Sequence, residues 1–154
     1  MAEIIYELGL QKVTGASAGP VGTVIPAAIA VGTGPPEIRE IGVFNVSGVA
    51  GELGLGVPAA AGSGTVTGGT VQQLTPWRAA GHTQVATSFG TTQPTAPGTF
   101  MRRWEVQAVV GAGSIFTWAP GEFILWQGAT IPQIVIWQIS AVAVTYDFYV
   151  KVAE

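Results

Sequence analysis

The chain has 154 residues, of which 48% are hydrophobic and 10% are charged, and its formal net charge is −3. This length suits one domain, the apolar content excludes a disordered chain, and the lack of cysteine excludes disulfides and thiolate metal sites. The six basic residues are scattered along the sequence, so there is no basic patch that would bind nucleic acid directly.

Helical periodicity is weak because the 22 Gly and 10 Pro residues interrupt nearly every window long enough for a helix. Short runs rich in Val, Ile, Thr and aromatic residues predict β-strands instead. In chain order the predicted strands are Ile4–Val13, Thr23–Val31, Glu37–Val46, Thr65–Leu74, Thr83–Phe89, Trp104–Ala108, Ser114–Trp118, Glu122–Gln127, Gln133–Ser140 and Tyr146–Val152. One or two of them are expected to be loops. The pattern predicts an all-β chain: a single-domain antiparallel β-sandwich over residues 1–154, jelly-roll-like, with eight strands in two sheets.

The first predicted strand has two interpretations. The segment Ile4-Ile-Tyr-Glu-Leu is separated from the next strand by small residues and Pro20, so residues 1–13 could extend as an arm to a neighbouring subunit. Alternatively, they form an ordinary first strand of their own sheet. On the arm hypothesis, Ile4, Ile5 and Tyr6 are candidate interface residues.

Two segments show the alternation of a sheet with one buried face. In the last segment, Tyr146, Phe148, Val150 and Val152 share one face, and Asp147 lies on the other. In the segment from Trp104 to Ala108, the apolar residues share one face; Glu105 and the preceding Arg103 lie on the other and are expected to form a surface ion pair. The longest predicted connection runs from Gly48 to Gly64, because it lacks alternation and consists mostly of small residues.

The sequence contains no catalytic or cofactor motif in the context that its chemistry needs. The run Gly51-Glu-Leu-Gly-Leu-Gly has neither the spacing nor the following helix of a nucleotide-binding loop. The single histidine, His82, has no metal-ligating neighbours in sequence, and the serines lack a nucleophile-elbow context. Glu105 and Glu122 are interpreted as surface and turn residues. The sequence therefore predicts a protein that is not an enzyme and that has no catalytic, metal or cofactor site.

Five tryptophans are the most informative large side chains. Exposed Trp rings would suit a carbohydrate- or receptor-binding module, but Trp104, Trp118, Trp126 and Trp137 lie in apolar segments and are expected to fill the core. Trp77 differs because it follows Pro76 at a strand end and precedes Arg78. Both residue types are enriched at interface hot spots, so Trp77 and Arg78 are candidate contact residues.

The most apolar stretch, from Ile131 to Val150, contains Gln133, Gln138 and Asp147, which a membrane-spanning helix tolerates poorly. No secretory signal is expected either, because the first residues carry two acids and no base. The sequence therefore predicts a soluble protein without a membrane partner, whose low charge suits burial against other chains.

Several segments together carry a family resemblance. They are Glu40-Ile-Gly-Val-Phe-Asn, Gly54-Leu-Gly-Val-Pro-Ala-Ala, Phe100-Met-Arg-Arg-Trp, the run from Gly111 to Gly121, and the terminal Tyr149-Val-Lys-Val-Ala-Glu. With these segments the chain resembles small β-rich virion structural proteins of tailed bacteriophages. The resemblance rests on strands and turns and transfers no site residues.

The resemblance implies a place in the virion, assembled in the host cytoplasm, as a capsid decoration or cement protein. It further implies contacts to the major capsid protein and to other copies of the chain, with a trimer expected before a dimer. A neck or tail component is the alternative within the same family type. A carbohydrate- or receptor-binding module is the second alternative.

Overall fold

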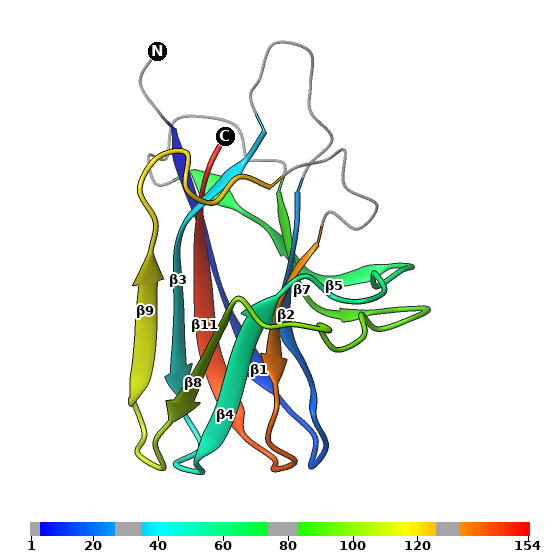
Figure 1. Cartoon of the computed structure of the whole chain (residues 1–154), viewed down its shortest axis with the longest axis vertical. Helices are drawn as coiled ribbons and strands as arrows, with labels where there is room; N and C mark the ends of the chain where they lie inside the picture. Colours follow the sequence, from blue (N-terminus) through cyan, green and yellow to red (C-terminus); the bar gives the residue numbers. More distant parts are fainter. Residues whose placement is uncertain (1–3, 27–34, 74–82, 126–132) are drawn as a thin grey trace.

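The computed structural model describes residues 4–26, 35–73, 83–125 and 133–154, and all regular elements in these ranges are β-strands (Figure 1). In chain order they are β1 (Ile5–Val13), β2 (Gly19–Ile25), β3 (Glu37–Asn45), β4 (Gly51–Gly56), β5 (Val66–Thr70), β6 (Gln72–Gln73), β7 (Gln84–Phe89), β8 (Arg102–Val106), β9 (Gly113–Thr117), β10 (Ile134–Gln138) and β11 (Thr145–Ala153). Sheet A has the order β6-β1-β11-β3-β9, and sheet B has the order β5-β7-β2-β10-β4-β8. The predicted all-β sandwich is confirmed.

Eight of these strands pair as one long ribbon folded back on itself. β1 pairs with β11, β2 with β10, β3 with β9 and β4 with β8, so the first four meet the last four in reverse order. All four pairings are antiparallel, and β11–β3 and β10–β4 contacts complete the two sheets. This wrapped ribbon is the jelly-roll arrangement that the sequence predicted. The remaining strands β5, β6 and β7 lie between β4 and β8 in sequence and extend the sheets at their edges.

The core lies between the two sheets and is built from alternate residues of the strands. In β11, Tyr146, Phe148, Val150 and Val152 are buried while Asp147 is exposed, which confirms the predicted alternation. Sheet B contributes apolar side chains from β4 and β10 to the same cluster. Removing these side chains from water is the main favourable contribution to folding.

The chain start is a strand of its own sheet. β1 pairs with β11 in unbroken register from Ile5–Ala153 to Val13–Thr145. Tyr6, Leu8 and Leu10 pack against the hydrophobic core. The structure therefore shows the second of the two interpretations of this segment, because these backbone groups already have partners within the chain.

The predicted long connection from Gly48 to Gly64 is wrong, because it contains β4, a strand paired on both sides within sheet B. Leu53 and Leu55 face the core, where they are fully buried. On the outer side, a Cβ at Gly54 would overlap the Phe100 ring, and a Cβ at Gly56 would lie 3.0 Å from Pro97. Beyond Glu52, the strand carries glycines at its outer positions because another segment covers that face, so polar side chains do not alternate with the leucines there.

Other strand boundaries differ from the prediction. β2 begins at Gly19 rather than Thr23, and β8 runs from Arg102 to Val106 rather than from Trp104 to Ala108. β8 ends early because residues 107–112 fold into a turn closed by the Ala112 N–H donating to the Val109 carbonyl at 3.0 Å. Thr65–Leu74 divides into β5 and β6, and the described part of Glu122–Gln127 contributes only an isolated bridge between Ile124 and Glu37.

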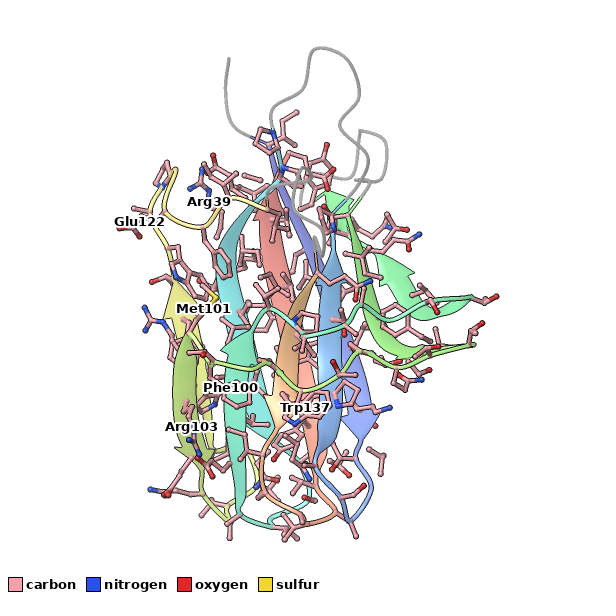
Figure 2. All side chains as sticks on the ribbon, turned by 45° about the vertical axis from the view of Figure 1, so that its right-hand side comes forward. Arg39, Phe100, Met101, Arg103, Glu122 and Trp137 are labelled. Carbon is pink, nitrogen blue, oxygen red and sulfur yellow. The ribbon has the colours of Figure 1, made fainter. Side chains whose placement is uncertain are left out.

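The tryptophans divide between the core and the surface. Trp104 and Trp118 are half-buried and pack against the core, with edge-to-face contacts to Phe116 at 4.8 Å and Phe123 at 5.0 Å respectively. Trp137 is half-buried opposite Gly54 on the outer face of sheet B, so the core prediction is wrong for it (Figure 2). Trp77 and Trp126 lie outside the described residues.

Candidate interaction surface at one end of the sandwich

Four loops meet at one end of the sandwich, at the bottom of Figure 1. They are residues 14–18 between β1 and β2, 46–50 between β3 and β4, 107–112 between β8 and β9, and 139–144 between β10 and β11. The jelly-roll ribbon brings them together because alternate turns of a folded ribbon fall at the same end. We call these four segments, together with Val13, the loop end.

The loop end contains no charged residue; its sequences are Thr-Gly-Ala-Ser-Ala, Val-Ser-Gly-Val-Ala, Gln-Ala-Val-Val-Gly-Ala and Ile-Ser-Ala-Val-Ala-Val. Four of its valines are exposed: Val13 by 66%, Val49 by 41%, Val109 by 57% and Val110 by 66%. Single exposed apolar residues are ordinary, but several grouped on an uncharged surface are typical of an interaction site.

Asn45, which is fully buried at the end of β3, holds two of these loops in place. Its amide donates hydrogen bonds to the backbone carbonyls of Val49, at 2.7 Å, and Gln107, at 2.8 Å. Its side-chain oxygen accepts from the backbone N–H groups of Ser47 and Gly48, at 3.0 and 3.1 Å. One side chain therefore satisfies backbone groups in two separate loops, which fixes them relative to each other.

Gln138 and Thr14 fix the other two loops in the same way. Gln138 is fully buried, and its amide donates to the carbonyls of Ser140, at 2.9 Å, and Val142. The Thr14 hydroxyl lies 2.7 Å from the Gln138 side-chain oxygen and pairs with both backbone groups of Val144. All four loops are thus held by buried polar side chains, and the exposed valines project from a well-ordered surface.

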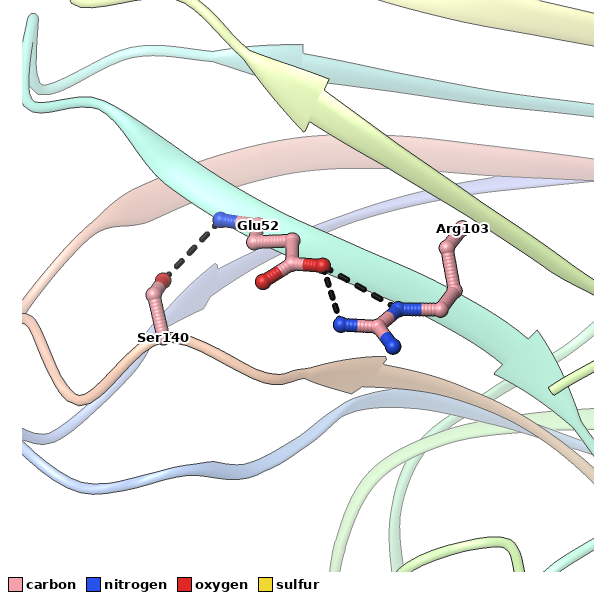
Figure 3. Close-up of polar contacts among 3 residues, drawn as sticks. All are labelled: Glu52, Arg103 and Ser140. Carbon is pink, nitrogen blue, oxygen red and sulfur yellow. Dashed lines mark hydrogen bonds and ion pairs between the residues drawn. The ribbon is translucent and has the colours of Figure 1, made fainter. Parts of the chain in front are cut away.

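The charged residues Glu52 and Arg103 lie at the border of the loop end, on the outer face of sheet B (Figure 3). The Arg103 guanidinium binds Glu52, with Nε 3.1 Å from Oε1, and the Glu52 N–H donates to the Ser140 hydroxyl at 2.9 Å. The predicted Arg103–Glu105 ion pair is therefore wrong. Glu105 lies directly opposite Glu52 in the β4–β8 register, while Arg103 lies two residues along, opposite Gly54, and its side chain reaches diagonally to Glu52. A shallow depression of about 450 Å³ between these strands and Ser140 joins this border to the loop end.

Of the candidate interface residues named from the sequence, those that the structure describes lie away from the loop end. Ile4, Ile5 and Tyr6 are half-buried at the opposite end of β1 from Val13, and Tyr6 contributes to the core. Trp77, Arg78 and His82 lie outside the described residues. The signal that identifies the loop end, four uncharged turns of small residues, is visible in the sequence, but only the strand pairing shows that they meet.

The described residues hold no group of three or more His, Asp or Glu side chains placed to ligate a metal. The same residues include no helix long and apolar enough to cross a membrane. Glu122 has a structural role, because its carboxylate accepts the Ala119 N–H at 2.7 Å and closes a turn. The arrangement at the loop end suits contact with another macromolecule more than bond-making chemistry.

Comparison of the chain with protein-family models, with curated proteins and with solved structures finds no match.

Proposed function

We propose that this protein is a non-enzymatic structural protein of a virion that decorates the capsid shell. Its partners are the major capsid protein and further copies of itself, and it stabilises the shell by binding across neighbouring capsid subunits. The observation that carries this proposal is the loop end, which is uncharged, apolar and held rigid by Asn45, Gln138 and Thr14.

The chemistry of the loop end suits a large assembled partner. Depletion of charged residues is the compositional signal of interface centres, and the loop end contains no charged residue. Burial of one exposed valine contributes about 1.5 kcal/mol, so several valines make a contact that is modest for one copy. Many copies on one shell add such contacts and stabilise the assembled state by mass action.

Preorganisation strengthens such a contact. Ordering flexible loops on binding costs free energy, which the hydrogen bonds of Asn45 and Gln138 have already offset in the folded chain. The jelly roll itself is found in capsid proteins and in lectins alike, so the fold agrees with the proposal without selecting it. The resemblance of the sequence to small phage virion proteins, rather than the fold, is what favours a virion over other large assemblies as the partner.

The deciding measurement is the copy number of this protein in purified particles, determined by quantitative protein gel. A copy number close to that of the major capsid protein supports shell decoration. A copy number as low as that of a symmetric portal or tail ring would overturn shell decoration and indicate a neck or tail component instead. Absence from particles would overturn both.

A paired variant tests the surface. Replacing Val49 and Val110 by Asp puts two charges into the loop end. We expect the affinity of this variant for capsid shells stripped of the protein to fall by about a hundredfold or more. Val57→Asp is the matched control, because Val57 is exposed by 45% beyond the far end of β4. Equal binding by the paired variant and the control would exclude the loop end as the contact.

A further inference from the structure

The outer face of sheet A carries a flat aromatic surface that the proposed function does not use. A Cβ at Gly42 would overlap the Tyr149 ring, and a Cβ at Gly113 would lie 2.5 Å from Cδ1 of Phe44, so both rings occupy space above glycine backbone. The two ring planes lie within 20° of parallel and their centroids are 6.3 Å apart. At this distance near-parallel rings lie mainly side by side, and both are half-buried.

Polar contacts fix the Tyr149 ring in this position. Its hydroxyl donates to Glu40 Oε1 at 2.7 Å, and the Lys151 ammonium donates to the same oxygen at 2.6 Å. The ammonium also lies 5.3 Å from the centroid of the ring. The ring is therefore held in place before any ligand arrives, which reduces the cost of binding.

A shallow depression of about 440 Å³ adjoins the two rings. Its lining includes Glu7, Gly9 and Gln11 from β1 and Asp147 from β11, together with Phe44 and Tyr149. Gly9 stands directly opposite Tyr149 in the register and has no side chain, which leaves room beside the ring. Gln11 Nε2 donates to Asp147 Oδ1 at 2.8 Å, so an amide and a carboxylate lie at the rim with defined orientation.

We infer that this face binds a neutral glycan, with a sugar ring against Phe44 and Tyr149 and its hydroxyl groups on Asp147 and Gln11. Sugar rings have an apolar C–H face and a hydroxylated edge, and this site offers an aromatic surface beside a carboxylate and an amide. A carboxylate accepts hydrogen bonds from hydroxyls, and an amide both donates and accepts them. A few placed polar groups beside apolar surface are typical of small-ligand sites.

Charge argues for a neutral ligand. Glu7 and Asp147 line the depression, so an anionic ligand would be repelled. The ammonium of Lys151 is already engaged by Glu40 and does not offset these carboxylates for a ligand. The inference is independent of the loop end, because the two surfaces differ in position and in chemistry.

Amide NMR titration with maltohexaose, cellohexaose and chitohexaose tests the inference on the intact chain. We expect at least one of these glycans to bind with a Kd of about 1 mM or tighter, with shifts centred on Gly9, Gly42 and Asp147. Phe44→Ala should weaken that binding about tenfold. Asp147→Asn, an isosteric change at an exposed position, should weaken it about threefold or more.

Met101→Ala is the matched control, because Met101 is exposed by 56% and precedes β8 in sheet B (Figure 2). It should leave glycan affinity unchanged. The inference is overturned if none of the three glycans shifts the amides of this face, if the shifts centre on the loop end, or if Phe44→Ala and Asp147→Asn both bind as wild type. Binding of the paired loop-end variant to capsid shells is a separate measurement, so failure here leaves the proposed function standing.

Discussion

Tyr149 of β11 lies over Gly42 of β3, its directly opposite residue in the sheet A register, and occupies the space that a side chain at position 42 would fill. Gly42 is buried under the ring, and Tyr149 carries its hydroxyl to Glu40, also on β3. The absence of one side chain thus positions another, and with it the Glu40–Tyr149–Lys151 group.

Gly42→Ala is expected to displace the Tyr149 ring and break its hydrogen bond to Glu40. Overpacking of this kind costs about 1–3 kcal/mol of stability. Burial, helped by Glu40, raises the pKa of Tyr149 to about 12, so the variant should lower that pKa toward its ordinary value of 10.0. Ring chemical shifts followed against pH measure this change. Gly98→Ala, where an added Cβ meets nothing within 4 Å, should leave the pKa of Tyr149 unchanged.

Glu40 makes the stability depend on pH at both ends of the range. Hydrogen bonds from Lys151 and Tyr149 lower the pKa of Glu40 from its ordinary 4.5, and the hydrogen bond to Glu40 raises the pKa of Lys151. A lowered carboxyl pKa contributes stability above pH 4.5 that is lost as the pH falls through the folded-state value. Burial of the ring, and then its hydrogen bond to Glu40, raises the pKa of Tyr149, so the folded protein loses stability as the pH rises from 10.0 toward about 12.

We therefore expect Glu40→Gln to be less stable than wild type at neutral pH, with a difference that shrinks below pH 4.5. Urea unfolding at a series of pH values measures it. Glu122→Gln is a control, because Glu122 is exposed and closes a local turn. A constant difference across the acidic range would contradict the assigned role of Glu40.

Asn45 is expected to be among the residues most sensitive to polar substitution. Asn45→Asp retains the acceptor for Ser47 and Gly48 but cannot donate to the carbonyls of Val49 and Gln107, and it places a charge in a buried site. Loss of stability should reach about 3 kcal/mol, and should exceed that of Asn45→Ala. Chemical denaturation measures both. If Asn45→Asp were as stable as wild type, the bonds to Val49 and Gln107 would contribute nothing to the order of the loop end.

Tyr146→Phe is expected to be neutral or to stabilise the protein by up to about 1 kcal/mol. The Tyr146 hydroxyl is buried, finds no hydrogen-bond partner among the described residues, and lies where a Cβ of Gly51 would be. Burial raises the pKa of Tyr146 to about 12, so wild type should also lose more stability than the variant as the pH approaches that value. Tyr146→Leu, which removes the ring, should cost about 2–4 kcal/mol in the same thermal unfolding assay. A Tyr146→Phe loss of that size would show that the hydroxyl is bonded after all.

The strands with one solvated face were predictable because alternation of apolar and polar residues records which face is buried. β11 is the clearest example, with Tyr146 and Phe148 inward and Asp147 outward. β4 was not predictable by this rule. Its outer face is covered by residues 97–100, so Gly54 and Gly56 stand where an ordinary strand would carry polar side chains. No residue pattern near β4 in the sequence indicates that residues 97–100 cover this strand.

The sequence by itself determined the all-β class, the jelly-roll expectation and the scarcity of chemistry-bearing side chains, because composition and period-two alternation are local properties. The tertiary structure alone decided which surfaces exist. Strand pairing between positions more than a hundred residues apart, such as Val13 with Thr145, gathers four uncharged turns at one end. The same pairing seats Tyr149 over Gly42 and turns Arg103 toward Glu52 rather than Glu105. These relationships depend on register across the sheet, which neighbouring residues in the chain do not encode.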